Sequence, residues 1–163
     1  MTDTVDARPV ASLTFVRPPV GNAEEALLLL TRAAVEQGYA LSTLPEAVVD
    51  RERQHPTGLP TPLPCAIPHA DASHVRRPGI GLLLADRPLE FREMGSKDRT
   101  VAARLVVLLL VDDPTRHVGL LGGLVRTLQR TDLEEFLTTD LAGPDDLAAR
   151  LTAALEDQAG TSV

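Results

Sequence analysis

The segment 105–111 restricts the fold of this chain more than any other. All seven of its residues are apolar, without the alternation of apolar and polar side chains that marks a strand with one solvated face. A continuously apolar strand is typical of a sheet that is covered on both faces. We therefore expect a central strand here, with other elements packed above and below it.

Shorter apolar runs and helix-capping signals surround this segment. Further strands are expected at 11–16, 65–67, 79–85 and 87–91, and the proline-rich stretch 55–62 is expected to be a loop. Helices are expected from Asn22 to about Gly38, from Thr43 to about Gln54, after Asp113, after Thr131 and from Pro144. Strands that alternate with helices predict an α/β fold in a single domain, with helices on both faces of the sheet.

Composition excludes several classes of function. The chain has 163 residues and a net charge of −7, which disfavours binding to nucleic acid. Its single cysteine, Cys65, rules out an internal disulfide, and we interpret it as a small buried hydrophobe rather than a nucleophile. Neither a secretory signal nor a membrane-spanning run is visible, so a cytoplasmic protein is expected.

Two histidines follow predicted strands. His69 comes directly after Pro68, which stiffens the loop and helps to aim the ring. The same pattern is also compatible with an ordinary surface histidine. His117 lies in the first turn after Pro114, four residues before Leu121, so it should point inward. There it could donate an N–H to a phosphoryl oxygen, or be a core histidine with a satisfied hydrogen bond. Because open α/β sheets hold their chemistry at strand ends, a shared site is the more informative hypothesis.

Arg51 is the third candidate site residue. It shares the inward side of its helix with Val48 and Ala47, and a guanidinium can grip two phosphoryl oxygens. An arginine near a helix C-terminus is also common for reasons of dipole alone.

Two other sequence features are not interpreted as functional sites. A zinc site from His69, Asp71 and His74 has no recognised spacing, and no nucleotide-binding loop is present, so neither metal nor cofactor is expected. Three glycines in the predicted helix after Asp113 are expected to mark close packing against a neighbour: Gly119, Gly122 and Gly123.

Taken together, several segments occur in the order of a known family. They are Asp50–Glu52, Pro56–Leu59, Ala66–His69, Phe91–Gly95, the strand 105–111, and His117 with Leu120 and Leu121. The chain resembles the IIA component of the bacterial phosphoenolpyruvate-dependent sugar phosphotransferase system, of the fructose/mannitol superfamily. Pro56–Leu59 and Phe91–Gly95 look most like the galactitol-type branch.

The resemblance implies a mixed β-sheet and a phosphoryl carrier, with the family domain at 10–157 and flexible tails at 1–9 and 158–163. In the family, the histidine that maps to His69 accepts the phosphoryl group from the phosphocarrier protein HPr and passes it to a cysteine of the IIB component. His117 would orient that group and Arg51 would neutralise its charge, whereas Glu52 is uncertain and His55 is not expected in the site. The membrane component IIC would be met only indirectly.

Two other functions remain open. The domain could be a regulatory phospho-switch of the nitrogen-related IIA type, which binds partners rather than feeding transport. A degenerate domain kept only for interactions is disfavoured by the presence of His69, His117 and Arg51 together. The transported sugar cannot be inferred, because it does not touch this component.

Overall fold

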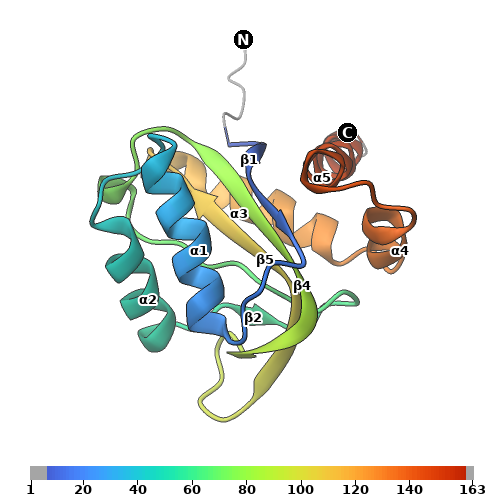
Figure 1. The fold of residues 1–163 in the computed structure, drawn as a ribbon, viewed down its shortest axis with the longest axis horizontal. Coiled ribbons are helices and arrows are strands. Elements are labelled where there is room, and N and C mark those ends of the chain that lie inside the picture. Colours follow the sequence, from blue (N-terminus) through green and yellow to red (C-terminus); the bar gives the residue numbers. More distant parts are fainter. Residues whose placement is uncertain (1–6, 161–163) are drawn as a thin grey trace.

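The computed structural model describes residues 7–160, apart from the side chains of His117, Ala159 and Gly160. One five-stranded mixed sheet forms the centre of the molecule (Figure 1). Its strands, in spatial order, are β1 (Pro9–Val16), β4 (Gly79–Arg92), β5 (Thr100–Leu110), β3 (Cys65–Ala66) and β2 (Gly58–Leu59). The predicted α/β fold with a mixed sheet is confirmed.

The strand β5 is the middle strand of this sheet. It pairs antiparallel with β4 on one side and parallel with β3 on the other. Its residues from Leu105 to Leu110 are all at most 1% exposed, so the predicted central strand is confirmed. Its start at Thr100 is five residues earlier than expected, because residues 100–104 alternate between exposed and more buried positions and residues 100–103 pair with the second part of β4.

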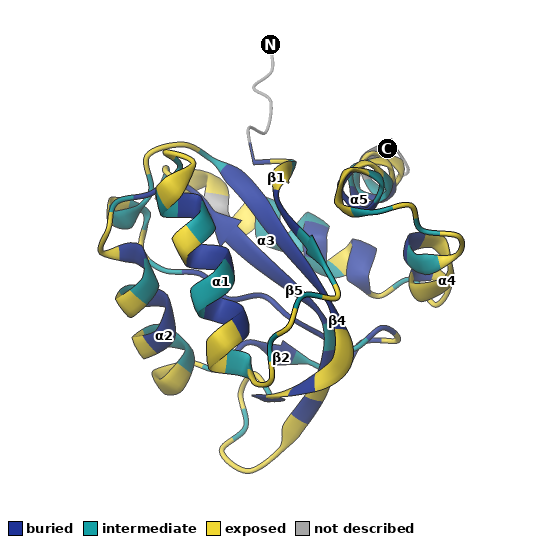
Figure 2. Cartoon of the chain, in the orientation of Figure 1, coloured by how far each residue is buried: buried dark blue, intermediate teal, exposed yellow. Residues whose placement is uncertain are grey.

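Helices cover both faces of the sheet. The helices α1 (Ala23–Glu36) and α2 (Leu44–Gln54) lie on one face, and α3 (Pro114–Leu128), α4 (Leu133–Thr138) and α5 (Pro144–Gly160) lie on the other (Figure 1). Two separate apolar clusters result, and both appear as buried stretches in Figure 2.

Successive side chains of β5 point to opposite faces, as strand geometry requires. Val106 and Leu108 join the cluster under α1 and α2, whereas Leu105 and Val107 join the cluster under α3 and α5. The unbroken apolar run of the sequence therefore serves two cores at once.

Local signals specified the ends of α1 and α3. Asn22 accepts a hydrogen bond from the N–H of Glu25 (2.9 Å), and Gly38 follows the helix with a φ of +83°. Asp113 caps α3 by accepting from the N–H of Thr115 (3.0 Å), with Pro114 as the first helical residue. Both predicted caps are confirmed.

The capping predictions for α2 and α4 were wrong. Thr43 precedes α2 but has a helical backbone and makes no capping bond; its hydroxyl pairs instead with Nδ1 of His74 (2.8 Å). A tertiary partner thus took the hydroxyl that a cap would use. Asp132, rather than Thr131, precedes α4, and it too makes no side-chain capping bond.

Two further expectations need correction. The segments 79–85 and 87–91 form one strand, β4, because β5 pairs with both parts across a register shift between Leu84 and Leu89. The predicted loop 55–62 contains the short edge strand β2, where the N–H of Met94 donates to the carbonyl of Gly58 (2.8 Å). A Cβ at Gly58 would lie 2.6 Å from the carbonyl oxygen of Arg92, so the chains approach closely there.

The glycines of α3 do not mark close packing. A Cβ at Gly119 would meet nothing within 4 Å, and at Gly122 and Gly123 it would meet only the side chain of Arg126. This prediction was wrong, because sequence alone does not distinguish a glycine that admits a neighbour from one that faces open space.

Within the described part of the chain, no helix is long and apolar enough to cross a membrane. Residues 1–6 and 161–163 of the two predicted tails lie outside the described residues.

Candidate functional site

His69 is held at the end of the sheet by its backbone. It follows β3 and forms an isolated parallel bridge with Leu109, and the N–H of Leu109 donates to the carbonyl of Pro68 (3.0 Å). Because β3 and β5 are parallel, this places His69 at their carboxyl ends, where open α/β sheets bind ligands. The residue is 9% exposed.

The ring of His69 has a defined tautomer. Its Nδ1 lies 2.9 Å from the carbonyl oxygen of Ile67. A carbonyl oxygen only accepts hydrogen bonds, so Nδ1 carries the proton. In the neutral ring, Nε2 therefore holds the lone pair and is the nucleophilic nitrogen.

His69 lines a pocket of about 490 Å³. Arg51 enters it from the last turns of α2, and the Nε of Arg51 is buried without a hydrogen-bond partner among the described residues. A guanidinium in this position attracts an anion, and its fork can bind two oxygens. The rest of the lining comes from the loop after His69, from the residue that follows β5 and from the start of α3: Ala70, Asp71, Ala72, Ser73, Val111, Pro114 and Val118.

The start of α3 forms an exposed wall of the pocket. Pro114 and Val118 both line it, and Val118 is 78% exposed. The backbone of His117 lies in α3 between them, whereas its side chain lies outside the described residues. The hydroxyl and N–H of Thr115 both bond to Asp113, and these hydrogen bonds hold the pKa of that carboxyl below its usual range.

Glu52 has contacts that the sequence did not reveal. Its carboxylate accepts hydrogen bonds from the N–H (2.9 Å) and the hydroxyl (2.8 Å) of Thr57. Burial raises the pKa of the Glu52 carboxyl, and the two bonds from Thr57 oppose that rise. A glutamate followed five residues later by a threonine in a proline-rich loop was the available signal.

Several other polar residues stay out of the pocket. His55 is exposed at the end of α2, and His74 bonds to Thr43. Among the described residues, no group of three or more histidine, cysteine or acidic side chains is placed to hold a metal ion. Cys65 is fully buried, and burial raises the pKa of its thiol to about 11, which suppresses the reactive thiolate.

Comparison with known proteins places the chain in a family. The family model described as phosphoenolpyruvate-dependent sugar phosphotransferase system, EIIA 2, matches residues 11–151. The galactitol-specific EIIA component of Escherichia coli K12 is 32% identical over 128 residues, which are 77% of this chain and 85% of that protein. The corresponding component of Escherichia coli O157:H7 matches to the same extent.

Solved structures share the fold. The nitrogen regulatory protein IIA-Ntr of Neisseria meningitidis superposes with a TM-score of 0.70 at 22% identity, covering 88% of this chain and 95% of its own. The Escherichia coli mannitol IIA, solved in complex with phosphorylated mannitol IIB, superposes with a TM-score of 0.67 at 20% identity, covering 92% and 98%. At these identities the likeness concerns the fold alone. Sequence match and fold agree, and the chain belongs to the EIIA type 2 family of the phosphoenolpyruvate-dependent sugar phosphotransferase system.

Proposed function

We propose that this protein is a phosphoryl carrier that accepts a phosphoryl group from HPr on His69 and passes it to a IIB component of a sugar transporter. The observation that carries the proposal is the juxtaposition of His69 and Arg51 in one pocket at the end of the sheet. Membership of the EIIA type 2 family and the galactitol-specific relatives support it.

The proposed chemistry needs only the residues of the pocket and the partner. The Nε2 lone pair of His69 attacks phosphorus, a new N–P bond forms, and the N–P bond of the phosphohistidine on HPr breaks. The Nδ1 proton stays on the hydrogen bond to Ile67, and HPr leaves with the lone pair on its own ring nitrogen. A nucleophile of IIB then attacks the phosphorus, the N–P bond to His69 breaks, and the lone pair returns to Nε2. Such a transfer depends mainly on positioning and charge stabilisation.

Arg51 and His117 have supporting roles in this proposal. Arg51 grips the equatorial oxygens and offsets their charge, which fits its buried Nε, since that atom has no hydrogen-bond partner within the described part of the chain. His117 orients the phosphoryl group, a role supported by the position of Pro114 and Val118 on either side of it in the pocket wall. Replacing His117 with alanine should slow transfer to IIB more than it destabilises the fold.

The partners would dock on the rim of the pocket. Val118 offers an exposed apolar contact in the wall of the pocket, and Asp71 and Ser73 provide an exposed polar edge. A solved relative, the mannitol IIA, has been captured with phosphorylated IIB. We expect HPr and IIB to use this rim in turn in the cytoplasm, with IIC reached only through IIB.

The decisive experiment is phosphorylation by phosphoenolpyruvate, Enzyme I and HPr. Wild type should gain one acid-labile phosphate, His69→Ala should gain none, and the exposed control His55→Ala should behave as wild type. If His69→Ala is labelled as fully as wild type, the assignment of the acceptor is wrong.

The regulatory alternative would use the same site. It remains a second candidate because the chain shares its fold with the nitrogen regulatory protein IIA-Ntr. Transfer to purified IIB, together with sugar uptake in a deletion strain, separates the two functions. Loss of uptake in the deletion supports transport. Normal uptake with altered regulation would favour the switch.

A further inference from the structure

We propose that Glu52 is a positioning residue that fixes the Nδ1–H tautomer of His69 through Thr57 and Ile67. This proposal rests on the proposed function, because the tautomer of His69 affects reactivity only if Nε2 of the ring attacks phosphorus. Glu52 does not line the pocket that contains His69. The proposal concerns a chain of hydrogen bonds across three segments: the end of α2, the loop before β2, and the end of β3.

The first link fixes the direction of the Thr57 hydroxyl. One carboxylate oxygen of Glu52 accepts from that hydroxyl (2.8 Å), and the other accepts from the N–H of Thr57 (2.9 Å). An ionised carboxylate only accepts, so the Thr57 hydroxyl must donate toward it. The lone pairs of the hydroxyl are thereby turned toward its other neighbour. Thr57 is 2% exposed, so water does not compete for these bonds.

The second link connects Thr57 to the residue that holds the ring. The N–H of Ile67 donates to the Thr57 hydroxyl oxygen (3.2 Å) and also approaches the Thr57 carbonyl (3.3 Å). The carbonyl of Ile67 in turn accepts from Nδ1 of His69 (2.9 Å). Because Ile67 is fully buried, its backbone has no alternative solvent partner. The place of the Ile67 carbonyl, and with it the proton on Nδ1, depends on Thr57.

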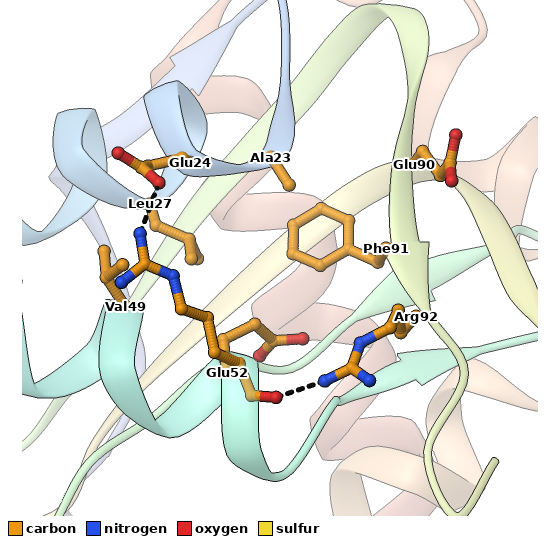
Figure 3. A pocket seen from close by; sticks show the side chains of 9 residues that line it. Ala23, Glu24, Leu27, Val49, Glu52, Glu90, Phe91 and Arg92 are labelled. Atoms are coloured by element: carbon orange, nitrogen blue, oxygen red, sulfur yellow. Dashed lines mark hydrogen bonds and ion pairs between the residues drawn. The ribbon is translucent and has the colours of Figure 1, made fainter. Parts of the chain in front are cut away.

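The position of Glu52 separates it from the pocket of His69. Arg51 lines the pocket with His69, whereas its neighbour Glu52 lines a second cavity of about 160 Å³ together with Phe91 and Arg92 (Figure 3). Arg92 donates to the backbone carbonyl of Arg53 at the end of the same helix, which ties α2 to β4. Adjacent residues of α2 therefore serve two purposes: Arg51 faces the transferred group, and Glu52 braces the loop behind it.

The first test reads the ring directly. Protein labelled with ¹⁵N-histidine is examined at about pH 8, where an ordinary imidazole is neutral. Nitrogen shifts in wild type should show a protonated Nδ1 and an unprotonated Nε2 for His69. In Glu52→Gln and Thr57→Val, the shifts should move toward the Nε2–H tautomer, and Thr57→Ser should restore the wild-type spectrum. Wild-type shifts for His69 in both broken variants would overturn the proposal.

The second test measures the initial rate of phosphorylation by phospho-HPr. Loss of one link should lower the rate at saturating donor by about tenfold, the effect of about one hydrogen bond, with little change in KM for the donor. A fall in rate without any change of tautomer would indicate a structural role and would also overturn the proposal.

Matched controls isolate the chain of hydrogen bonds. Thr61→Val removes a buried hydroxyl from the same loop, where it bonds to the carbonyl of Leu63 (2.8 Å) and not to Ile67. Glu46→Gln neutralises an exposed carboxylate on the same helix. Both should keep the wild-type tautomer and rate. Glu52→Gln and Thr57→Val break the chain at different atoms, so either one that folds suffices.

The two proposals fail in different ways. If wild type accepts no phosphoryl group, the proposed function is wrong, while the ring spectra still test the positioning role. If wild type is phosphorylated and the spectra of the variants match wild type, only the positioning role is wrong.

Discussion

His69 and the start of α3 line one pocket, but they are held in opposite ways. The His69 wall is buried: its backbone pairs with Leu109, and its ring bonds to a carbonyl of fully buried Ile67. The α3 wall is exposed: Val118 is 78% exposed, and a Cβ on Gly119 would meet nothing within 4 Å. The proposed acceptor ring is thus held in place by the protein itself, whereas the α3 wall is left exposed for the partners that are proposed to dock there.

The largest expected effect tests the buried wall. Ile67→Ala should lower the free energy of unfolding by about 4 kcal/mol, because it empties a fully buried site beside the sheet. Val118→Ala on the exposed wall should change it by less than about 0.5 kcal/mol. Denaturant unfolding of both variants checks the contrast, and equal losses would contradict it.

The second effect concerns charge inside the pocket. Arg51→Ala should slow phosphorylation of His69 by about 100-fold, or about 2.7 kcal/mol, because the transferred group loses its guanidinium. Arg53→Ala is the control, since Arg53 pairs with Glu24 and Asp50 and does not line the pocket of His69. Arg51→Lys should recover part of the rate. Equal rates for Arg51→Ala and Arg53→Ala would show that Arg51 does not assist the transfer.

The third effect tests the open wall as a docking rim. Val118→Asp should raise KM for phospho-HPr by about tenfold, or about 1.4 kcal/mol, without altering stability. Met94→Asp, another exposed apolar residue but outside the pocket, should leave KM unchanged. Steady-state kinetics with both variants checks this, and an unchanged KM for Val118→Asp would place docking elsewhere.

A smaller effect sharpens the contrast in backbone freedom. Gly119→Ala should stabilise the protein by about 0.8 kcal/mol, because alanine favours a helix and its methyl group finds open space. Gly38→Ala should instead destabilise it by about 1 kcal/mol, since Gly38 has a φ of +83°. Thermal unfolding of the two variants checks that their stabilities change in opposite directions.

The smallest effect is the pH dependence that Glu52, which is linked by hydrogen bonds to the buried wall, adds to the free energy of unfolding. Burial raises the pKa of its carboxyl in the folded state, so the folded protein binds more protons than the unfolded chain between the two pKa values. Its contribution to stability is therefore present at low pH and falls as pH rises through that window. Unfolding free energies measured across the acid range should fall less in Glu52→Gln than in wild type. An identical slope would show that Glu52 titrates as in the unfolded chain.

The sequence predicted features whose causes are local. The caps of Asn22 and Asp113, and the central strand 105–111, depend on residues within one turn or one strand, and all three are confirmed. The pairing of Thr43 with His74 spans 31 positions, and no local pattern contains it.

The candidate site shows the same division. Arg51 and His69 were singled out from residue type and position, and the structure brings them to one pocket; their roles stay predictions. The bracing of Ile67 by Glu52 and Thr57 was missed, because it appears only when three segments meet.

The close approach at Gly58 limits how this chain can drift in sequence. Any side chain there would collide with the backbone of Arg92, and backbone atoms cannot turn aside as a flexible side chain can. A substitution must therefore displace the hairpin that joins β4 and β5, although position 58 does not line the pocket. Position 58, between Thr57 and Leu59, is thus restricted to glycine on steric grounds. A distant homologue that lacks this glycine should have a differently shaped hairpin.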